Sequence, residues 1–309
     1  MRSALELGLC ALLVSLDGDV PMFAVLDEPG SGRPPRLPSD RLDIDGDETL
    51  ELAVRRQVTA HLGIDVGYVE QLYTFGDRDR DPRTAHGWPR VVSVAYLGLV
   101  RGTPTLTPGA RWAPLYSHLP WEDAREGVSV LAMQAHGACA GSGLGAGPRS
   151  RVGADGHGLE ERAAISFPMA PGKWDEYRVL ERYELLYELG LAAESGGAGD
   201  YGPPLALDHR RILASGLGRL RGKLRYRPVV FEFLEETFTL FQLQRVVEAI
   251  AGVRLHKQNF RRLVERGGLV EATGGVDRST GGRPAACFRF RPEVRFERQA
   301  PGISIPRGG

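Results

Sequence analysis

The pattern of hydrophobic and polar positions is clearest in the last quarter of the chain. Apolar residues recur there every three or four positions, which predicts a helix with one buried face. They are Leu240, Leu243, Val246, Val247 and Ile250. Thr239 is expected to cap this helix and Gly252 to end it. A second helix is predicted over 256–267, where Phe260, Leu263 and Val264 can share a buried face.

Two short strands are predicted after the second helix. Apolar and polar residues alternate over 269–273 and 286–291, and a glycine-rich loop that carries Arg278 and Arg283 joins the two runs. The order of helix, turn, helix and hairpin predicts a winged helix-turn-helix, whose second helix enters the DNA major groove. Asn and Gln can bond adenine there, while Arg reads guanine or phosphate. The candidate DNA-binding residues are Lys257, Gln258, Asn259, Arg261, Arg262, Arg278 and Arg283.

Charge is distributed unevenly, although the formal net charge is zero. Residues 205–298 carry 19 Arg or Lys against 10 Asp or Glu, whereas residues 1–204 carry 19 against 29. Such an asymmetry is expected when one part of a chain faces phosphate. The identity of each Arg carries less information, because the chain has 36 Arg and three Lys, which suggests a codon-composition bias. A winged helix that docks on a protein is the alternative to DNA binding.

The N-terminal part begins with a predicted strand, turn and strand over 6–26. Glu6 interrupts the first apolar run, which argues against a cleavable signal segment. No stretch approaches ~20 uninterrupted apolar residues, so no membrane span is predicted. Three scattered cysteines without zinc-type spacing fit a reducing compartment, and we expect a cytoplasmic protein.

Two helices and one low-complexity segment are predicted in the middle of the chain. Residues 174–191 and 208–224 show helical spacing, and the second helix has a strongly basic face opposite its apolar one. Residues 136–160 are rich in Gly, Ala and Ser, and we interpret them as a flexible insertion.

Residues 45–64 resemble the Nudix box, which reads Gly, five residues, Glu, seven residues, then Arg-Glu-aliphatic-x-Glu-Glu-x-Gly-aliphatic. Anchoring on Arg56 places four residues on the motif: Glu48, Val58, Gly63 and Ile64. Leu42 replaces the opening glycine, and the three helix glutamates are replaced by Gln57, Ala60 and His61. In Nudix hydrolases those glutamates hold a divalent metal against a diphosphate. The resemblance therefore implies binding without hydrolysis; an amphipathic helix that matches by chance is the alternative.

The resemblance extends over most of the chain, except residues 136–160 and the tail after 296. Segments 69–83, 91–100, 208–214 and 219–229 and the winged-helix region resemble the Nudix-related transcriptional regulators of NAD metabolism, of NrtR and NadQ type. Asn259-Phe-Arg-Arg and Gly282-Arg-Pro-Ala are the more specific markers. The implied fold is α+β with α-β-α layers.

Its expected parts are a Nudix-like mixed-sheet domain over 1–230, a winged helix-turn-helix over 231–296 and a tail over 297–309. The resemblance implies a homodimeric repressor that binds a palindromic operator in double-stranded DNA near NAD-synthesis or salvage genes. It also implies a sensor of ADP-ribose or a related NAD-derived nucleotide, with no cofactor. The segment from Trp112 to Trp121 is closer to the NadQ branch, which leaves the effector open. A nucleotide-diphosphate hydrolase with an appended basic domain, such as an ADP-ribose pyrophosphatase, and a protein-docking scaffold are the alternatives.

The candidate ligand-binding residues lie mainly in and just before an Asp/Arg/Pro-rich loop. They are Arg41, Arg56, Tyr73, Phe75, Arg78, Arg80 and Arg83. The three loop arginines can clamp a diphosphate bidentately, and the two aromatic rings can stack on adenine. A solvated loop with local Asp–Arg pairs is the alternative, and Arg56 can serve instead as an ion-pair residue that anchors its helix.

Overall fold

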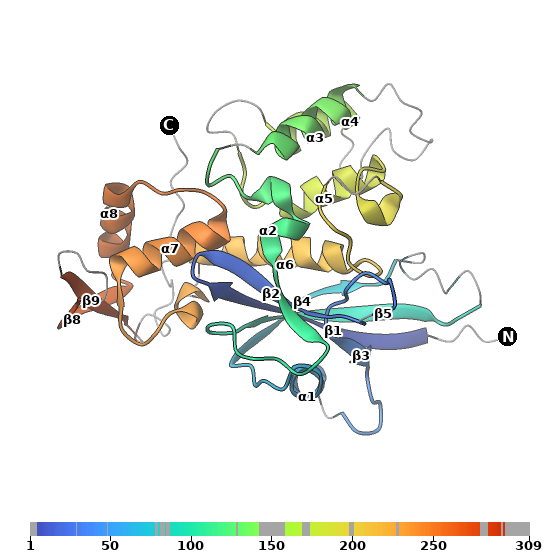
Figure 1. Cartoon of the computed structure of the whole chain (residues 1–309), viewed down its shortest axis with the longest axis horizontal. Helices are drawn as coiled ribbons and strands as arrows, with labels where there is room; N and C mark the ends of the chain where they lie inside the picture. Colours follow the sequence, from blue (N-terminus) through green and yellow to red (C-terminus); the bar gives the residue numbers. More distant parts are fainter. Residues whose placement is uncertain are drawn as a thin grey trace.

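The computed structural model describes most of the chain and shows two joined parts (Figure 1). The described residues are 5–28, 30–47, 49–77, 80, 84, 87–127, 129–141, 158–168, 174–197, 201–226, 229–278, 284–291 and 293. A mixed sheet with helices on both faces forms the N-terminal part. Two helices and a small sheet form the C-terminal part.

The large sheet is built around β1, which is buried along most of its length. Its strands are β1 (Leu5–Asp17), β2 (Val20–Leu26), β3 (Ser39–Arg41), β4 (Tyr68–Phe75), β5 (Arg90–Leu99) and β6 (Ala110–Pro114). The order is β4-β5-β1-β2-β6, with β3 also paired to β1. Only β1 and β5 pair in parallel among these strands of the described chain. The predicted strand, turn and strand over 6–26 are confirmed.

Helices cover the sheet on opposite faces, which gives the expected α-β-α layers. Helix α1 (Leu50–Leu62) packs Val54 and Val58 into one core cluster with Leu9. Helix α6 (His209–Tyr226) packs on the other face, in a second cluster with Leu12. Its Gly216 lies so close to β1 that an added Cβ would overlap the end of the Leu12 side chain, which would have to move.

Shorter helices surround α6 on the same side of the sheet. They are α2 (Leu115–His118), α3 (Val130–Gly141), α4 (Leu159–Ser166) and α5 (Val179–Glu188), with the 3-10 turns η2 (Pro120–Glu122), η3 (Ala193–Ser195) and η4 (Val229–Phe233). Helix α5 is shorter than the predicted 174–191. The beginning of the predicted insertion, 136–141, is helical, whereas 142–157 lies outside the described residues. In the described part of the chain, no helix has the length and apolar character needed to cross a membrane.

The predicted basic face of α6 is not all at the surface, because two of the arginines of this helix are buried. Arg210 and Arg221 are fully buried. Arg210 pairs with Glu194 at 2.9 Å and Arg221 with Glu122 at 2.6 Å. These carboxylates come from distant segments of the chain, so helical periodicity alone does not reveal that the two arginines are neutralised inside the fold.

The C-terminal part has the predicted order of elements. They are β7 (Phe238–Thr239), α7 (Leu240–Ala251), α8 (Lys257–Gly267), β8 (Val270–Asp277) and β9 (Ala285–Phe290), and the sheet order is β7-β9-β8. Thr239 caps α7, and the Gln242 side chain completes a capping box. Strand β8 continues past the predicted end at 273, because a bulge between Ala272 and Val276 keeps it paired with β9.

Candidate nucleic-acid interface

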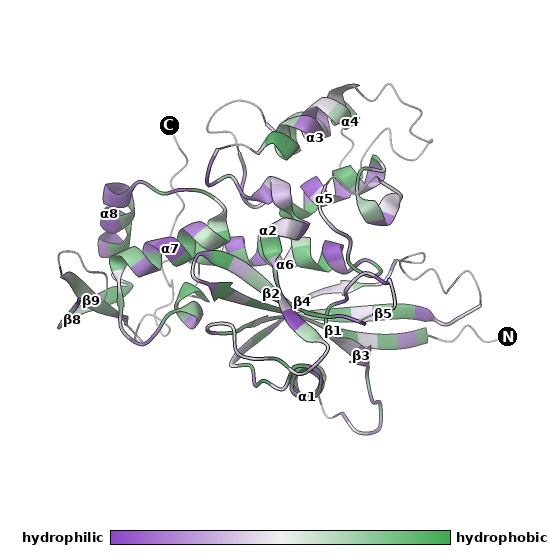
Figure 2. Ribbon diagram, in the orientation of Figure 1, coloured by the Kyte–Doolittle hydropathy of each residue, from purple (hydrophilic) through white to green (hydrophobic). Residues whose placement is uncertain are grey.

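Helix α8 exposes a polar and basic surface, drawn mostly in the hydrophilic colour in Figure 2. Phe260 and Val264 are buried beneath it as predicted and fix the orientation of the helix, whereas Leu263 is only half-buried. The exposed set contains the predicted residues Lys257, Gln258, Asn259, Arg261 and Arg262. No ion pair within the described chain neutralises its three cations. These side chains are therefore available to a partner rich in acceptors and negative charge.

The wing lies next to α8 and contributes a further cation. Arg278 is exposed at the end of β8, whereas Arg283 lies outside the described residues. A groove of about 550 Å³ separates the two elements, with Lys257 and Arg261 on one side and the start of β9 on the other. Phe241 also lines this groove and is 59% exposed. Phe241 was not predicted as a candidate residue from the sequence. Its position outside the apolar stripe of its helix nevertheless indicates an exposed aromatic side chain.

A buried ion cluster connects the winged-helix part to the large sheet domain. At its centre is the fully buried Glu122, whose carboxylate binds Arg182 of α5 and Arg221 of α6 at 2.6 Å each. Burial disfavours the charged form of Glu122, but the two guanidinium groups outweigh this effect and hold its pKa below the ordinary value. The carboxylate is therefore charged at neutral pH.

The same cluster holds the C-terminal end of α7. Arg221 Nε donates to the Ile250 carbonyl at 3.0 Å, and the Tyr116 hydroxyl donates to the Ala249 carbonyl at 2.7 Å. Carbonyls at a helix end lack partners within the helix, so the large domain supplies them. Gly252 follows with a positive φ of 70°, and an added Cβ there would overlap the Glu122 carbonyl oxygen.

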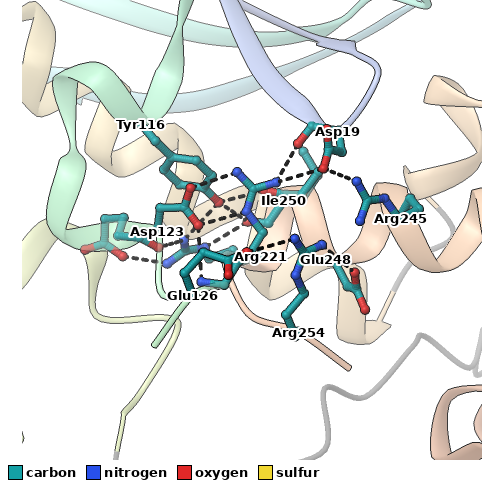
Figure 3. Close-up of polar contacts among 12 residues, drawn as sticks. Asp19, Tyr116, Asp123, Glu126, Arg221, Arg245, Glu248, Ile250 and Arg254 are labelled. Atoms are coloured by element: carbon teal, nitrogen blue, oxygen red, sulfur yellow. Dashed lines mark hydrogen bonds and ion pairs between the residues drawn. The ribbon is translucent and has the colours of Figure 1, made fainter. Parts of the chain in front are cut away.

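A second, more exposed set of contacts lies beside this cluster (Figure 3). Asp19, in the turn between β1 and β2, binds Arg245 of α7. Arg125 also approaches Asp19, at 3.7 Å, while Arg254 pairs with Glu126 at 3.0 Å. The Asp19 and Arg245 side chains are about one-third exposed. The winged helix is thus attached by a buried anchor and by solvent-accessible ion pairs.

The predicted ligand-binding residues do not form one cluster. Arg80 is buried and binds both oxygens of Asp208, at 2.6 and 2.8 Å, which favours a structural role. Arg56 pairs with Asp47 at 2.7 Å, which agrees with its alternative role as an ion-pair residue of its helix. Arg41 pairs with Glu6 at 2.8 Å. Arg78 and Arg83 lie outside the described residues.

The two predicted aromatic residues do lie together, on β4. Tyr73 is 65% exposed and Phe75 is 6% exposed. Their rings meet edge to face, with centroids 5.4 Å apart. Tyr73 therefore has a free ring surface for a ligand, whereas Phe75 supports it from beneath.

The segment that resembles the Nudix box forms α1 and the loop before it. Gln57 is buried, and its amide donates to the Arg41 carbonyl at 3.2 Å. His61 Nε2 lies 3.6 Å from Asp40. Ala60 is exposed, and Glu48 lies outside the described residues. Within the described ranges, no three His, Cys, Asp or Glu side chains are grouped closely enough to hold a metal ion.

These observations define the class of protein: a mixed-sheet domain with helices on both faces, joined to a winged helix. Residues 230–290 match the family described as the NrtR DNA-binding winged helix domain. The ADPR responsive transcriptional repressor NtrR of Acinetobacter baylyi is 38% identical over 86 residues, which are 28% of this chain and 34% of that protein. The chain thus aligns with about a third of the length of this curated relative.

Solved structures show the same fold over nearly the whole chain. NrtR of Shewanella oneidensis, crystallised with a 27mer DNA, matches with a TM-score of 0.58 and 21% identity, covering 96% of this chain and 99% of that one. A MutT/nudix family protein from Enterococcus faecalis matches with a TM-score of 0.54 and 15% identity, covering 94% and 88%. The chain therefore has the same fold as NrtR over nearly its whole length, and residues 230–290 match the NrtR DNA-binding winged helix domain. The expected fold class is confirmed.

Proposed function

We propose that this protein is a DNA-binding transcriptional repressor that responds to ADP-ribose or a related NAD-derived nucleotide. The exposed face of α8 is the observation that carries the proposal. Its Lys257, Arg261 and Arg262 have no ion-pair partner among the described residues, and it lies within the segment that matches the NrtR winged helix. Phosphate supplies the negative charge that such a face lacks.

The chemistry of α8 divides into base reading and backbone positioning. Gln258 and Asn259 lie in the first turn, the part of a recognition helix that contacts base edges, and their amides can bond adenine. Arg261 and Arg262 can bind guanine or phosphate, and Arg278 places a cation where a wing follows the DNA backbone. We propose a homodimer on a palindromic operator, because paired recognition helices read half-sites about one helical turn apart.

The sheet domain is the proposed sensor, and it acts without hydrolysis. The Acinetobacter relative is named an ADPR responsive repressor, and the sheet domain shares its fold with a MutT/nudix protein. Gln57 and Ala60 stand where metal-binding glutamates would be, and neither offers the charged oxygens that a hard divalent cation prefers. The proposed site of action is the cytoplasm, and the proposed target genes are those of NAD synthesis or salvage.

Selection of genomic fragments with the purified protein tests this function. The selection is run without added nucleotide and then with NAD, ADP-ribose or nicotinate mononucleotide. We expect enrichment of a palindromic sequence near genes of NAD metabolism. We also expect one of the nucleotides to change the amount of this DNA that the protein retains. Fragments without a shared motif would contradict specific DNA binding. Release of AMP and ribose 5-phosphate from ADP-ribose with Mg²⁺ or Mn²⁺ would contradict the non-hydrolytic sensor and favour the hydrolase alternative.

A further inference from the structure

A pocket of about 600 Å³ lies between the edge strand β4 and the helices α5 and α6. Leu72 and Phe75 line it and belong to the core cluster on the α6 face of the sheet, whereas α1 packs in the cluster on the other face. The pocket is therefore separate from the segment that resembles the Nudix box. Its volume lies within the roughly 300–1,000 Å³ of small-molecule sites.

Small residues of α6 keep this pocket open. Ala214, Ser215 and Gly218 line it at positions where larger side chains would occupy the space. A Cβ added to Gly218 would meet the Tyr177 carbonyl only at 3.4 Å, an ordinary contact, so close packing does not require this glycine. The helix thus leaves room beside β4 that neither element fills.

A β-bulge in β4 turns Tyr73 toward this pocket. Gln71 pairs with Tyr96, whose side chain belongs to the α1-side cluster, and the register then shifts so that Tyr73 pairs with Ala95. Directly paired residues share a face, and Ala95 belongs to the α6-side cluster. Without the shift, Tyr73 would pair with Val94 and face α1. Bulges commonly re-aim a side chain beside a functional site.

The pocket pairs this exposed ring with charges that suit a nucleotide. Arg219 of α6 donates to the Leu72 carbonyl at 3.4 Å and has no carboxylate partner among the described residues. Arg211 lines the pocket two helical turns earlier and is neutralised by Glu184 at 2.5 Å, with Asp77 at 3.5 Å. A phosphate can bind Arg219, a base can stack on Tyr73, and carboxylate oxygens can accept from ribose hydroxyls.

We propose that this pocket binds a nucleotide through Tyr73 and Arg219, on the face of the sheet opposite the Nudix-like helix. The role of this pocket as an effector site depends on the proposed function, whereas nucleotide binding as such is argued from the pocket alone. Its position also fits signalling to the winged helix. Arg219 stands two residues before Arg221, whose guanidinium holds the carbonyl at the end of α7. A ligand that binds Arg219 therefore contacts the same helix that anchors the DNA-reading part.

Isothermal titration calorimetry of the full-length protein with ADP-ribose and with AMP tests the site. We expect Tyr73→Ala and Arg219→Gln each to weaken binding at least tenfold, while Tyr73→Phe keeps the ring and the affinity. Arg33→Gln is the matched control: this exposed arginine pairs only loosely with Glu28, at 3.5 Å, and should change affinity less than twofold. Because Tyr73 is exposed, its replacement should leave the melting temperature unchanged.

Three results would overturn the proposal: unchanged affinity in both pocket variants, loss of binding in Arg56→Gln but not Arg219→Gln, or no binding of either nucleotide by the unmodified protein. DNA affinity is measured separately by fluorescence anisotropy. If nucleotide binding depends on Tyr73 and Arg219 but no DNA sequence is bound, the result supports the nucleotide site and refutes the regulatory function. If DNA is bound but the pocket variants retain nucleotide affinity, the result refutes the nucleotide site and leaves the regulatory function supported.

Discussion

Replacement of Glu122 by glutamine tests whether the buried ion cluster anchors the winged helix to the sheet domain. The Glu122 carboxylate is fully buried and binds both Arg182 and Arg221, which are also fully buried. Glutamine keeps the shape and one acceptor oxygen but removes the charge and turns an NH₂ group toward a guanidinium. Removing one partner of a buried ion pair destabilises a protein by about 3–5 kcal/mol. We expect a loss in that range.

Urea denaturation measures this loss directly, and thermal unfolding gives a second readout. For domains of 150–250 residues, 1 kcal/mol corresponds to a melting-temperature change of about 2–4 °C, so Glu122→Gln should lower the midpoint by roughly 6–20 °C. Asp19→Asn is the matched control. Its ion pair with Arg245 is about one-third exposed, and such pairs contribute ~0–1 kcal/mol. A loss under ~1 kcal/mol for Glu122→Gln, or equal losses for the two variants, would refute the anchor.

The pH dependence of stability provides an independent check on Glu122. Its folded-state pKa is lower than its ordinary value. The carboxylate therefore contributes stability that is fully present above the unfolded-state pKa of about 4.3 and is lost as pH falls through the depressed folded-state pKa. We expect the stability difference between the unmodified protein and Glu122→Gln to be constant near pH 7 and to shrink in acid. A difference that grows in acid would contradict this sign.

Three further predictions concern the interface and the fold. Arg262→Ala should weaken operator binding tenfold or more and reduce the salt slope by about one, whereas nucleotide affinity measured by calorimetry should not change; equal loss of both would indicate misfolding. Gly252→Ala should cost roughly 2–5 kcal/mol in urea denaturation, because left-handed backbone and overlap with the Glu122 carbonyl both oppose a Cβ; wild-type stability would contradict the close approach. Arg80→Met should cost about 3–5 kcal/mol by leaving Asp208 buried without its partner, and unchanged stability with lost nucleotide binding would restore its predicted role as a ligand contact.

Local sequence patterns were sufficient to predict the winged helix. Thr239 caps α7 and Gly252 ends it as predicted, because capping and left-handed glycine depend on residues within one turn. Helical spacing likewise placed Phe260 inside and Asn259 outside. The end of β8 was not predicted, since its continuation past 273 depends on pairing across a bulge with β9.

Long-range contacts explain what the sequence did not reveal. Arg221 belongs to an expected basic face, yet its partner Glu122 lies 99 residues away and makes the arginine part of the core. Arg80 was expected in a ligand site, but Asp208, 128 residues away, binds it inside the fold. Tyr73 and Phe75 were both predicted as ligand contacts, and of the two only Tyr73 is exposed. The pocket residues Arg211 and Arg219 come from a helix that periodicity alone does not place beside β4.

Fluorescence anisotropy on the selected operator, with and without ADP-ribose, tests the central claim most directly. The account predicts salt-dependent binding by the unmodified protein, at least tenfold weaker binding by Arg262→Ala, and a change of fivefold or more on addition of ADP-ribose, the lower end of ordinary allosteric coupling. Operator affinity that is indifferent to ADP-ribose and its relatives, or absent at low salt, would contradict a nucleotide-responsive repressor.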